Sequence, residues 1–303
     1  MENKSVAIAS RMDSERAINL SKSIFNFLIE RKIPVFLETR LAPKIMPHSA
    51  TDLSQMTNEN TKFVISVGGD GSLLRVVNSL SQKDPPPILG VNIGSVGFMD
   101  ESNARNIFKD LEKVLNNEYL IEKCSKITPY IIRKNSEKIK LDSALNEILI
   151  VSSKSSKVLQ VSVTINGVFL NRNYLDGVII STSIGSTAYN LSAGGAIVFP
   201  KLDIMQIATL NAFAGSGLKP IVLPIDSEIE IKLLRPRLNA KIVIDGQKIV
   251  RNIQPNTTIV IKKAESCAKF IRLSKNLHKN YFRRLKKKII GTLRIPIDDS
   301  PEE

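Results

Sequence analysis

The chain has 303 residues, of which 43% are hydrophobic, so it can bury a large core and form either two domains or one large domain. Its formal net charge of +14 indicates either a polyanionic partner, such as nucleic acid or a phosphorylated small molecule, or a lysine-rich solvated surface. The two cysteines and two histidines show no metal-ligand spacing, which argues against a disulfide framework, a zinc site and a histidine-based catalytic triad.

The sequence contains no run of about 18 apolar residues, and its N-terminal stretch is too polar for a secretory signal. We therefore expect no membrane span and a cytoplasmic location. No RNA-recognition signature accompanies the positive charge, so nucleic acid is not an expected partner.

The N-terminal part of the chain alternates apolar runs with stretches of helical periodicity. Strands are predicted at 5–10, 34–38, 63–67 and 88–92, and helices at 15–32, 72–80 and 104–116. This alternation predicts a Rossmann-like parallel sheet with right-handed crossovers. We expect the α/β domain to span residues 1–117.

From residue 118 onward, short β-rich runs follow one another. Asn166-Gly167 lies between two alternating runs, which predicts a tight hairpin turn. We expect a β-rich, mainly antiparallel domain over 118–273. A helix over 274–290 with one basic face is expected to pack back on the first domain, followed by a frayed tail over 291–303.

Four stretches carry candidate chemistry, and the first is Gly68-Gly69-Asp70-Gly71-Ser72, which follows the predicted strand 63–67. Glycines at such a strand-to-helix loop let backbone amides approach a phosphate, and the helix start favours anions. A carboxylate repels phosphate, so Asp70 fits better as a base beside a transferring phosphoryl group. The alternative is a tight turn in which Asp70 caps the helix. The loop is not a Walker A motif, because no Gly-Lys-Ser/Thr follows.

The second and third stretches are shorter. The glycine loop GVNIGSVGFMD (90–100) would lie beside the first loop if their strands are neighbours. Asn146 and Glu147 lie inside an apolar β-like run, where polar side chains need partners or a ligand. An Asn–Glu pair can bind the vicinal hydroxyls of a ribose, but a solvated strand end explains it equally well.

The fourth stretch, Asp176 to Pro200, is dense in serine, threonine and glycine. It suits a pocket wall lined by hydroxyls and backbone amides, with Tyr189 available to stack on a base. The alternative is a polar loop that crosses a sheet edge. A serine nucleophile is not supported, because the G-x-S-x-G elbow is absent.

Together these stretches resemble the NAD kinase family, which phosphorylates NAD to NADP. The resemblance runs in order from about Val6 to Leu285 and is carried by GGDGS (68–72), GVNIGSVGF (90–98), NE (146–147), DG (176–177), GSTAYNLSAGG (185–195) and DGQ (245–247). The GGDG loop alone also resembles loops of diacylglycerol kinases, sphingosine kinases and phosphofructokinases. The 185–195 run is more specific to the NAD kinase family.

The resemblance implies an α/β N-terminal domain, a β-rich C-terminal domain and an active site between them. It implies transfer of the terminal phosphoryl of ATP, or of polyphosphate, to the adenosine 2′-hydroxyl of NAD, with Asp70 as the catalytic residue that accepts the hydroxyl proton. A divalent metal, usually magnesium, and a homodimer or homotetramer are also implied. No metal ligand is assigned by the resemblance.

The resemblance also assigns binding residues. The expected NAD-binding residues are Asp70, Gly71, Asn146, Glu147, Lys157, Asp176, Thr187, Ala188, Tyr189, Asn190, Leu191, Ser192 and Gln247. The expected phosphate-donor loop consists of Gly68, Gly69, Gly71 and Ser72.

The sequence departs from the family pattern at several positions. The family commonly has Ser-Thr-Pro-Thr before its Gly-Ser-Thr run, and this chain has Ser183-Ile184 in place of Pro-Thr. The family usually has proline at the position of Ala196. Lys219 stands where Arg is common, and Tyr174 stands where some members have a basic residue. Phe213-Ala214 replaces a Pro-His pair, so a histidine often found near the site is missing. Two other readings remain open: a lipid or sugar kinase built on the GGDG loop, and a non-enzymatic nucleotide- or RNA-binding protein.

Overall fold

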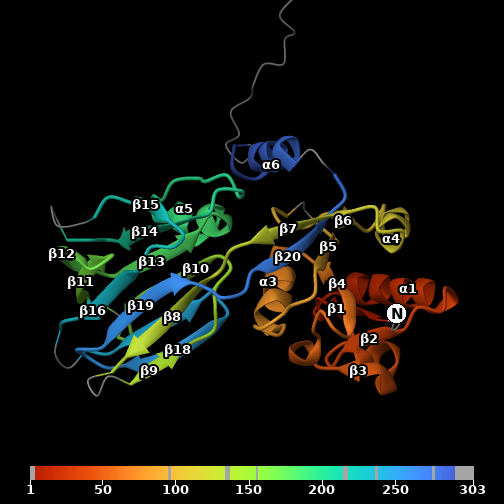
Figure 1. Cartoon of the computed structure of the whole chain (residues 1–303), viewed down its shortest axis with the longest axis horizontal. Helices are drawn as coiled ribbons and strands as arrows, with labels where there is room; N and C mark the ends of the chain where they lie inside the picture. The colour runs from red at the N-terminus through yellow and green to blue at the C-terminus, as the bar shows by residue number, and fades with distance from the viewer. Residues whose placement is uncertain are drawn as a thin grey trace, which may run out of the picture.

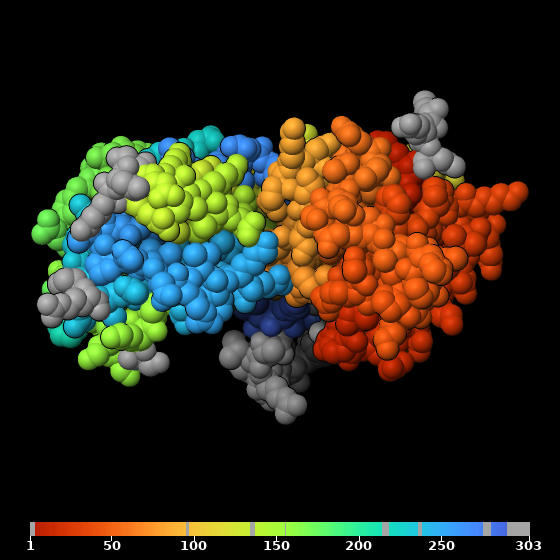
Figure 2. Space-filling view, turned by 90° about the horizontal axis from the view of Figure 1, so that it is seen from below, coloured from red at the N-terminus to blue at the C-terminus, as the bar shows by residue number. Residues whose placement is uncertain are grey.

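The computed structural model describes residues 4–94, 97–133, 137–154, 156–213, 218–235, 238–274 and 277–290. These residues form two lobes joined along a seam, with the N-terminal lobe at the right and the β-rich lobe at the left of Figure 1. In the space-filling view the dark-blue C-terminal helical segment lies at that seam (Figure 2). Among the described residues, no helix is long and apolar enough to cross a bilayer.

The first lobe is built on an eight-stranded sheet in the described part of the chain, in the order β3-β2-β1-β4-β5-β20-β7 with β6 beside β5. Its strands are β1 (Ser5–Ser10), β2 (Val35–Glu38), β3 (Ala50–Thr51), β4 (Thr61–Gly68), β5 (Ile88–Asn92), β6 (Ser102–Asn103), β7 (Leu120–Cys124) and β20 (Ala268–Arg272). Every pairing is parallel except that of β7 with β20. The predicted parallel sheet is therefore confirmed.

Helices cover both faces of this sheet. They are α1 (Glu15–Glu30), α3 (Asp70–Ser79) and α4 (Ile107–Leu115), with short turns at α2 (Ala42–Ile45), η1 (Pro47–Ser49) and η2 (Leu53–Gln55). Helix α1 begins after Ser14, whose hydroxyl accepts a hydrogen bond from the amide of Ala17, and it buries Ile24 and Leu28 at i, i+4 spacing. Apolar side chains of α1 and α4 pack on one sheet face, and those of α3 pack on the other.

The second lobe is a sandwich of two antiparallel sheets, each six-stranded in the described residues. One sheet contains β10 (Glu147–Ser152), β13 (Gly177–Thr182), β14 (Ile204–Leu210), β15 (Ile221–Pro224), β17 (Ala240–Ile244) and β18 (Lys248–Ile253). The other contains β8 (Ile127–Ile132), β9 (Lys138–Lys140), β11 (Leu159–Ile165), β12 (Val168–Leu175), β16 (Ile229–Leu233) and β19 (Thr258–Lys263). Inward-facing Ile and Val side chains from both sheets form one buried cluster, as alternating strand patterns require.

The predicted hairpin at Asn166-Gly167 is confirmed. Both residues have positive φ, 50° and 79°, which is the twist that a two-residue turn between antiparallel strands needs.

The sheets do not divide where the composition changes. Strands β7 and β20 lie within the range 118–273 that we expected to form the second domain, yet both hydrogen-bond into the first sheet. A β-rich run predicts a strand but not its partner, because sheet membership is set by non-local pairing. In Figure 1 these two strands lie at the side of the first sheet that is nearest the β-rich lobe.

The C-terminal segment forms α6 (Leu277–Leu285), which continues as a π-helical turn over Lys286–Ile290. It contacts both lobes: Arg284 donates to the Phe98 carbonyl at 2.7 Å, and the Tyr281 hydroxyl lies 3.3 Å from the Val198 carbonyl. The tail expected over 291–303 lies outside the described residues.

The core of the first lobe should depend on Phe63, which is fully buried on β4. We expect Phe63→Ala to lower the free energy of unfolding by about 3–5 kcal/mol, because it leaves a cavity between the sheet and its helices. Phe169→Ala on β12, where the ring is 56% exposed, should change it by less than about 0.5 kcal/mol. Urea unfolding of both variants checks this, and equal effects would contradict the assignment of Phe63 to the core.

Candidate active site

Asp70 is held by the second glycine loop. Its carboxylate accepts hydrogen bonds from the backbone amides of Phe98 at 2.9 Å and Met99 at 3.1 Å. The two loops meet because β4 and β5 are parallel neighbours, so their carboxyl ends emerge side by side. The expected proximity of the loops is therefore confirmed. The N-cap of α3 is Gly69, so the helix-cap alternative for Asp70 is wrong.

Gly97 is the residue that lets the loop close on Asp70. A Cβ at Gly97 would overlap the carboxylate of Asp70 and that of Asp100. The two acidic side chains thus flank the same glycine, and no larger residue fits there without displacing one of them.

Asp100 is a second carboxylate beside the candidate base. It is buried, and one of its oxygens accepts a hydrogen bond from the Asn92 side chain at 2.6 Å. Burial, with a smaller contribution from Asp70, raises the pKa of Asp100 to about 6. Near neutral pH the site therefore carries a pair of acids whose charges need nearby cations.

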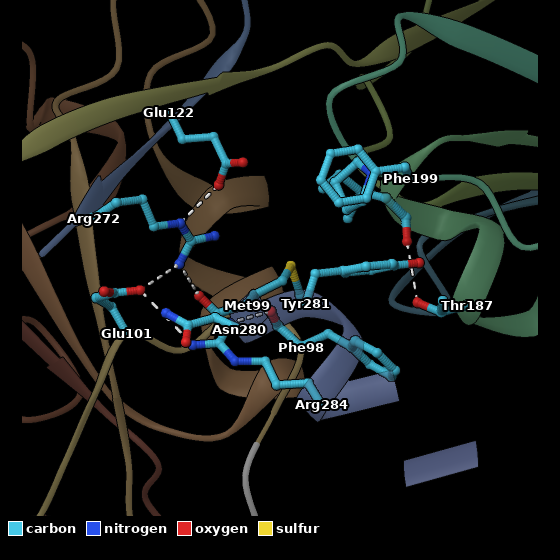
Figure 3. A pocket seen from close by; sticks show the side chains of 12 residues that line it. Phe98, Met99, Glu101, Glu122, Thr187, Phe199, Arg272, Asn280, Tyr281 and Arg284 are labelled. Atoms are coloured by element: carbon cyan, nitrogen blue, oxygen red, sulfur yellow. Dashed lines mark hydrogen bonds and ion pairs between the residues drawn. The ribbon is translucent and has the colours of Figure 1, made fainter. Parts of the chain in front are cut away.

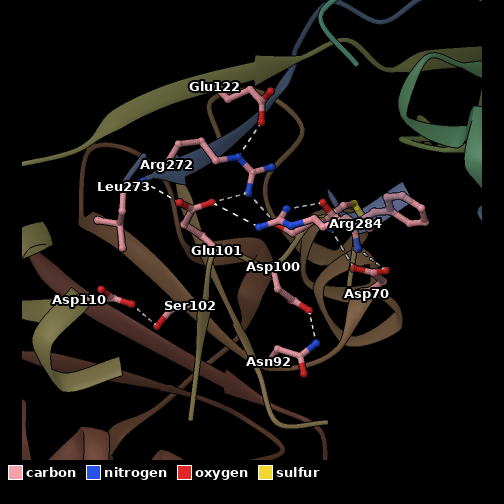
Figure 4. A network of polar contacts seen from close by, with 12 residues as sticks. Asp70, Asn92, Asp100, Glu101, Ser102, Asp110, Glu122, Arg272, Leu273 and Arg284 are labelled. Atoms are coloured by element: carbon pink, nitrogen blue, oxygen red, sulfur yellow. Dashed lines mark hydrogen bonds and ion pairs between the residues drawn. The ribbon is translucent and has the colours of Figure 1, made fainter. Parts of the chain in front are cut away.

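Those cations come from the C-terminal helix and from β20. Lys288 Nζ lies 2.9 Å from Asp70 Oδ2, and Arg284 holds the Phe98 carbonyl of the same loop. Arg272 is buried, donates to the Met99 carbonyl at 2.7 Å and pairs with Glu122 at 2.7 Å. Figure 4 shows this network running from β20 through the loop to Asp70.

A third acid, Asp245, fixes the backbone of Asn146 and Glu147, the predicted ribose-binding pair. Its carboxylate accepts hydrogen bonds from the amides of Leu145, Asn146 and Glu147 at 2.8, 2.7 and 3.1 Å. It also accepts one from the Asn78 side chain of α3 at 3.0 Å, so the same group ties the two lobes together. Asp245 has φ of 51° in a tight β17–β18 turn with Gly246.

Glu147 is nearly inaccessible, and among the described residues one of its carboxylate oxygens has no hydrogen-bond partner. Burial, followed by the nearby charge of Asp245, raises the pKa of Glu147 to about 7. The side chain can therefore exchange a proton near neutral pH.

The hydroxyl-rich stretch docks against this pair. It forms the short helical segments η3 (Ile184–Thr187) and α5 (Tyr189–Ser192) after β13. A Cβ at Gly185 would overlap the backbone of Asn146, so the two stretches are in close contact. The backbone amide of Tyr189 lies near enough to the Glu147 carboxylate to favour its ionised form.

Members of the stretch face different ways. Tyr189 is 46% exposed, whereas Asn190 is fully buried against Gly195 and its side-chain atoms have no partner within the described part of the chain. Ala188 lies between the two helical segments, and Leu191 and Ser192 follow in α5. Asn190 thus faces the interior in this conformation rather than the open side of the site.

Three cavities border these residues. One of about 810 Å³ is lined by Gly69, Gly71, Ser72, Gln247, Lys248 and three arginines, Arg11, Arg40 and Arg75. One of about 420 Å³ is lined by Lys157, Asp176, Tyr189, Asn211 and Lys241 among others. A small one of about 50 Å³ lies under α6, where Phe98 and Thr187 face Phe199 and Tyr281 (Figure 3).

The predicted residues therefore form a row that starts at the seam and continues into the second lobe. Gln247 donates to the Gly71 carbonyl at 3.1 Å, which joins the glycine loop to the β17–β18 turn. Tyr189 contacts Glu147 and also borders the cavity that contains Asp176 and Lys157. Gly68 lies slightly apart, because its Cα packs against the Ser72 side chain inside the loop.

Two of the positions that depart from the family pattern, Tyr174 and Phe213, lie next to each other. Phe213 is 72% exposed, and its amide donates to the Tyr174 carbonyl at 2.8 Å. Lys219 is exposed, and Ala214 lies outside the described residues.

Among the site residues that were given no role from the sequence are Asp100, Asp245, Arg284 and Lys288. Asp245-Gly246 could have been identified, since an Asp-Gly pair between alternating runs signals a tight turn. The two basic residues of α6 carry no local signal, because their role depends on where the helix docks.

Two family models match the chain: the ATP-NAD kinase N-terminal domain over residues 6–119 and the ATP-NAD kinase C-terminal domain over residues 145–273. An NAD kinase of Methanothermobacter thermautotrophicus is 33% identical over 285 residues, 94% of this chain and 96% of that protein. An NAD kinase of Methanosarcina mazei is 34% identical over 286 residues, 94% of each.

Solved structures agree. The fold is similar to that of yeast NADH kinase complexed with NADH, with a TM-score of 0.82, 21% identity, and coverage of 99% of this chain and 89% of that one. An NAD kinase from Archaeoglobus fulgidus in complex with ATP has a TM-score of 0.72 and 29% identity, and the match covers 93% of this chain and 98% of that one. On the two domain models and these relatives, the chain belongs to the NAD kinase family.

Proposed function

We propose that the protein transfers the terminal phosphoryl group of ATP to the 2′-hydroxyl of the adenosine ribose of NAD, giving NADP and ADP. The observation that carries this proposal is the carboxylate of Asp70, fixed by two backbone amides at the seam where the glycine loop meets the second lobe. The names of the relatives, and the ATP complex of the Archaeoglobus fulgidus enzyme, support both substrates.

Asp70 is the proposed general base. A ribose hydroxyl is a weak nucleophile at neutral pH, and a carboxylate held in one orientation can align it and accept its proton late in the reaction. The bond from the 2′-oxygen to the γ-phosphorus forms as the bond from that phosphorus to the bridging oxygen of ADP breaks, and the proton passes to Asp70. Positioning supplies most of the catalysis, since phosphoryl transfer needs little covalent chemistry from the protein.

The donor is proposed to bind in the cavity of about 810 Å³ beside the glycine loop. Gly69 and Gly71 line it, and a Cβ at either would meet no atom within 4 Å, so their backbone faces open space that phosphates can approach. The first turn of α3 adds a favourable field for anions. Arg40 provides a cation at the rim, where Arg11 is ion-paired with Asp13 of the same lining.

NAD is proposed to lie along the row of residues from the glycine loop to Asp176. Asn146 and Glu147 would hold the adenosine ribose, and the exposed ring of Tyr189 would support an aromatic base. The cavity of Asp176 and Lys157 would take the remaining part of the dinucleotide, with Lys157 near its phosphates. In this arrangement a ribose hydroxyl donates to the carboxylate of Glu147, which is 7% exposed.

Magnesium is part of the proposal. No group of three or more His, Cys, Asp or Glu side chains in the described residues could hold a metal ion. Magnesium in kinases is usually bound by one or two carboxylates together with the substrate phosphates. The residues present therefore fit an ion carried by the phosphate oxygens of the donor near the glycine loop. When bound, it would offset the negative charge of those oxygens.

Two finer points belong to the same proposal. Polyphosphate is a second donor that the open, arginine-rimmed cavity would accept, because a linear phosphate chain offers the same oxygens as ATP. A homodimer or homotetramer stays a prediction from the resemblance, and sedimentation velocity of the purified protein would test it.

Loss of the proposed base should slow the reaction without weakening the binding of NAD. We expect Asp70→Asn to lower kcat by about two to four powers of ten, the usual contribution of a general base. The dissociation constant for NAD, measured by calorimetry, should stay within about threefold. Asp226→Asn, whose side chain is 80% exposed and ion-paired in the second lobe, is the matched control. Near-normal turnover of Asp70→Asn would overturn the assignment.

Binding of NAD should depend on the protonation of Glu147. Its pKa of about 7 means that the acceptor form predominates only above pH 7. We therefore expect KM for NAD to fall about tenfold between pH 6 and pH 8 at saturating ATP, because the ribose hydroxyls bind the ionised carboxylate. The dependence of KM on pH should disappear in Glu147→Gln. That variant therefore distinguishes the titration of Glu147 from that of Asp100. A slope unchanged in that variant would exclude Glu147 as its cause.

The donor cavity can be tested at its rim. Arg40 is exposed there, so one contact to a phosphate should contribute about 1 kcal/mol at low salt. We expect Arg40→Ala to raise KM for ATP about fivefold and to leave KM for NAD unchanged. Arg16→Ala, an exposed arginine on α1, should leave both constants at their original values. A selective rise in KM for NAD would place the donor elsewhere.

A further inference from the structure

The C-terminal helical segment brings a cation to the reacting centre. Lys288 lies in the π-helical turn that follows α6, 218 residues beyond Asp70 in the sequence. Its ammonium is 2.9 Å from Asp70 Oδ2 and 5.0 Å from the centre of the Phe98 ring. Single π-helical turns in proteins occur frequently at functional sites.

Contacts with both lobes hold this segment over the site. One turn before Lys288, Arg284 donates to the Phe98 carbonyl, and it lies 3.8 Å from the buried carboxylate of Glu101. Further back, the ring of Tyr281 packs edge-on against Phe199 of the second lobe, with centroids 5.2 Å apart. Figure 3 shows these side chains converging from the two lobes. The position of Lys288 is thus set by packing rather than by its own ion pair.

The hydrogen-bonding capacity of Asp70 leaves room for a substrate. A carboxylate offers about four lone-pair sites. The Phe98 amide and Lys288 use Oδ2, and the Met99 amide uses one site on Oδ1. One acceptor site on Oδ1 is left for the hydroxyl that reacts. An ammonium carries three N–H donors, so one hydrogen bond to Asp70 does not by itself use up the donors of Lys288.

A cation at this position resolves an electrostatic conflict. The proposed reaction brings a negatively charged phosphoryl group next to Asp70, and Asp100 adds a second acid behind it. Two like charges at such range repel each other unless a cation intervenes. Lys288 is 31% exposed on its side chain, so it lies where a ligand can reach it.

We infer that Lys288 is a further catalytic residue of the proposed NAD phosphorylation: it donates a hydrogen bond to an oxygen of the transferring phosphoryl group while it remains paired with Asp70. The inference rests on the proposed function. Lys288 keeps all its protons throughout, because the hydroxyl proton passes to Asp70 and the leaving group is ADP. Its contribution is electrostatic stabilisation of charge on the phosphoryl oxygens.

Variants of Lys288 test the inference by NADP formation from NAD and Mg-ATP. We expect Lys288→Met to lower kcat about a hundredfold, the usual loss of one transition-state donor, with KM for NAD within about threefold. Lys288→Arg should retain more activity than Lys288→Met, because it keeps the charge. Lys287→Met is the matched control, since Lys287 is the exposed preceding lysine on the same turn.

Chemical rescue separates catalysis from structure. Ethylammonium added to Lys288→Ala should restore kcat in a saturable manner, whereas it should not restore Asp70→Asn. Unchanged kcat in Lys288→Met would overturn the inference. A raised kcat would also overturn it, because the ion pair would then hold Asp70 in an inactive state. A lower kcat that comes with a lower unfolding midpoint and is not rescued by the amine would show that Lys288 has a structural role only, and it would overturn the inference as well. If the unmodified protein forms no NADP, the proposed function fails and this inference fails with it.

Discussion

Two backbone amides that hold the carboxylate of Asp70 are the interaction on which the site depends. They exist because β4 and β5 are parallel neighbours, so the loops that follow them meet at one edge of the sheet. Gly97 leaves space for the carboxylate, and Arg272 fixes the loop from behind through the Met99 carbonyl. The candidate base is therefore oriented by the sheet itself rather than by a mobile side chain.

A second carboxylate, that of Asp245, performs the same task for the strand that carries the proposed ribose-binding pair. Asp245 accepts hydrogen bonds from three successive amides at the start of β10 and from the Asn78 side chain on α3. Because α3 begins with Asp70, the glycine loop and the Asn146-Glu147 pair are coupled through one helix. The acids of the site are balanced by cations of the C-terminal segment, which links the charge balance to the docking of α6 across both lobes.

Local patterns predicted much of this from the sequence. The strand-to-helix loop at Asp70, the hairpin at Asn166-Gly167 and the parallel sheet follow from residue type and periodicity over short windows. Sheet membership of β7 and β20 did not, because pairing partners are distant in the chain. Lys288 was missed for the same reason: a lysine in a basic run differs from its neighbours only by the surface that it meets. The inward side chain of Asn190 depends on packing against Gly195, which no local pattern encodes.

The most direct test of the account is a crystal structure of the protein with NAD bound. The account predicts that the 2′-oxygen of the adenosine ribose lies within about 3.2 Å of Asp70, in hydrogen-bond reach of its Oδ1, while the amides of Phe98 and Met99 keep their hold on the carboxylate. A ribose bound at Asn146 and Glu147 whose 2′-oxygen points away from Asp70, with no path for a phosphate donor between them, would contradict it.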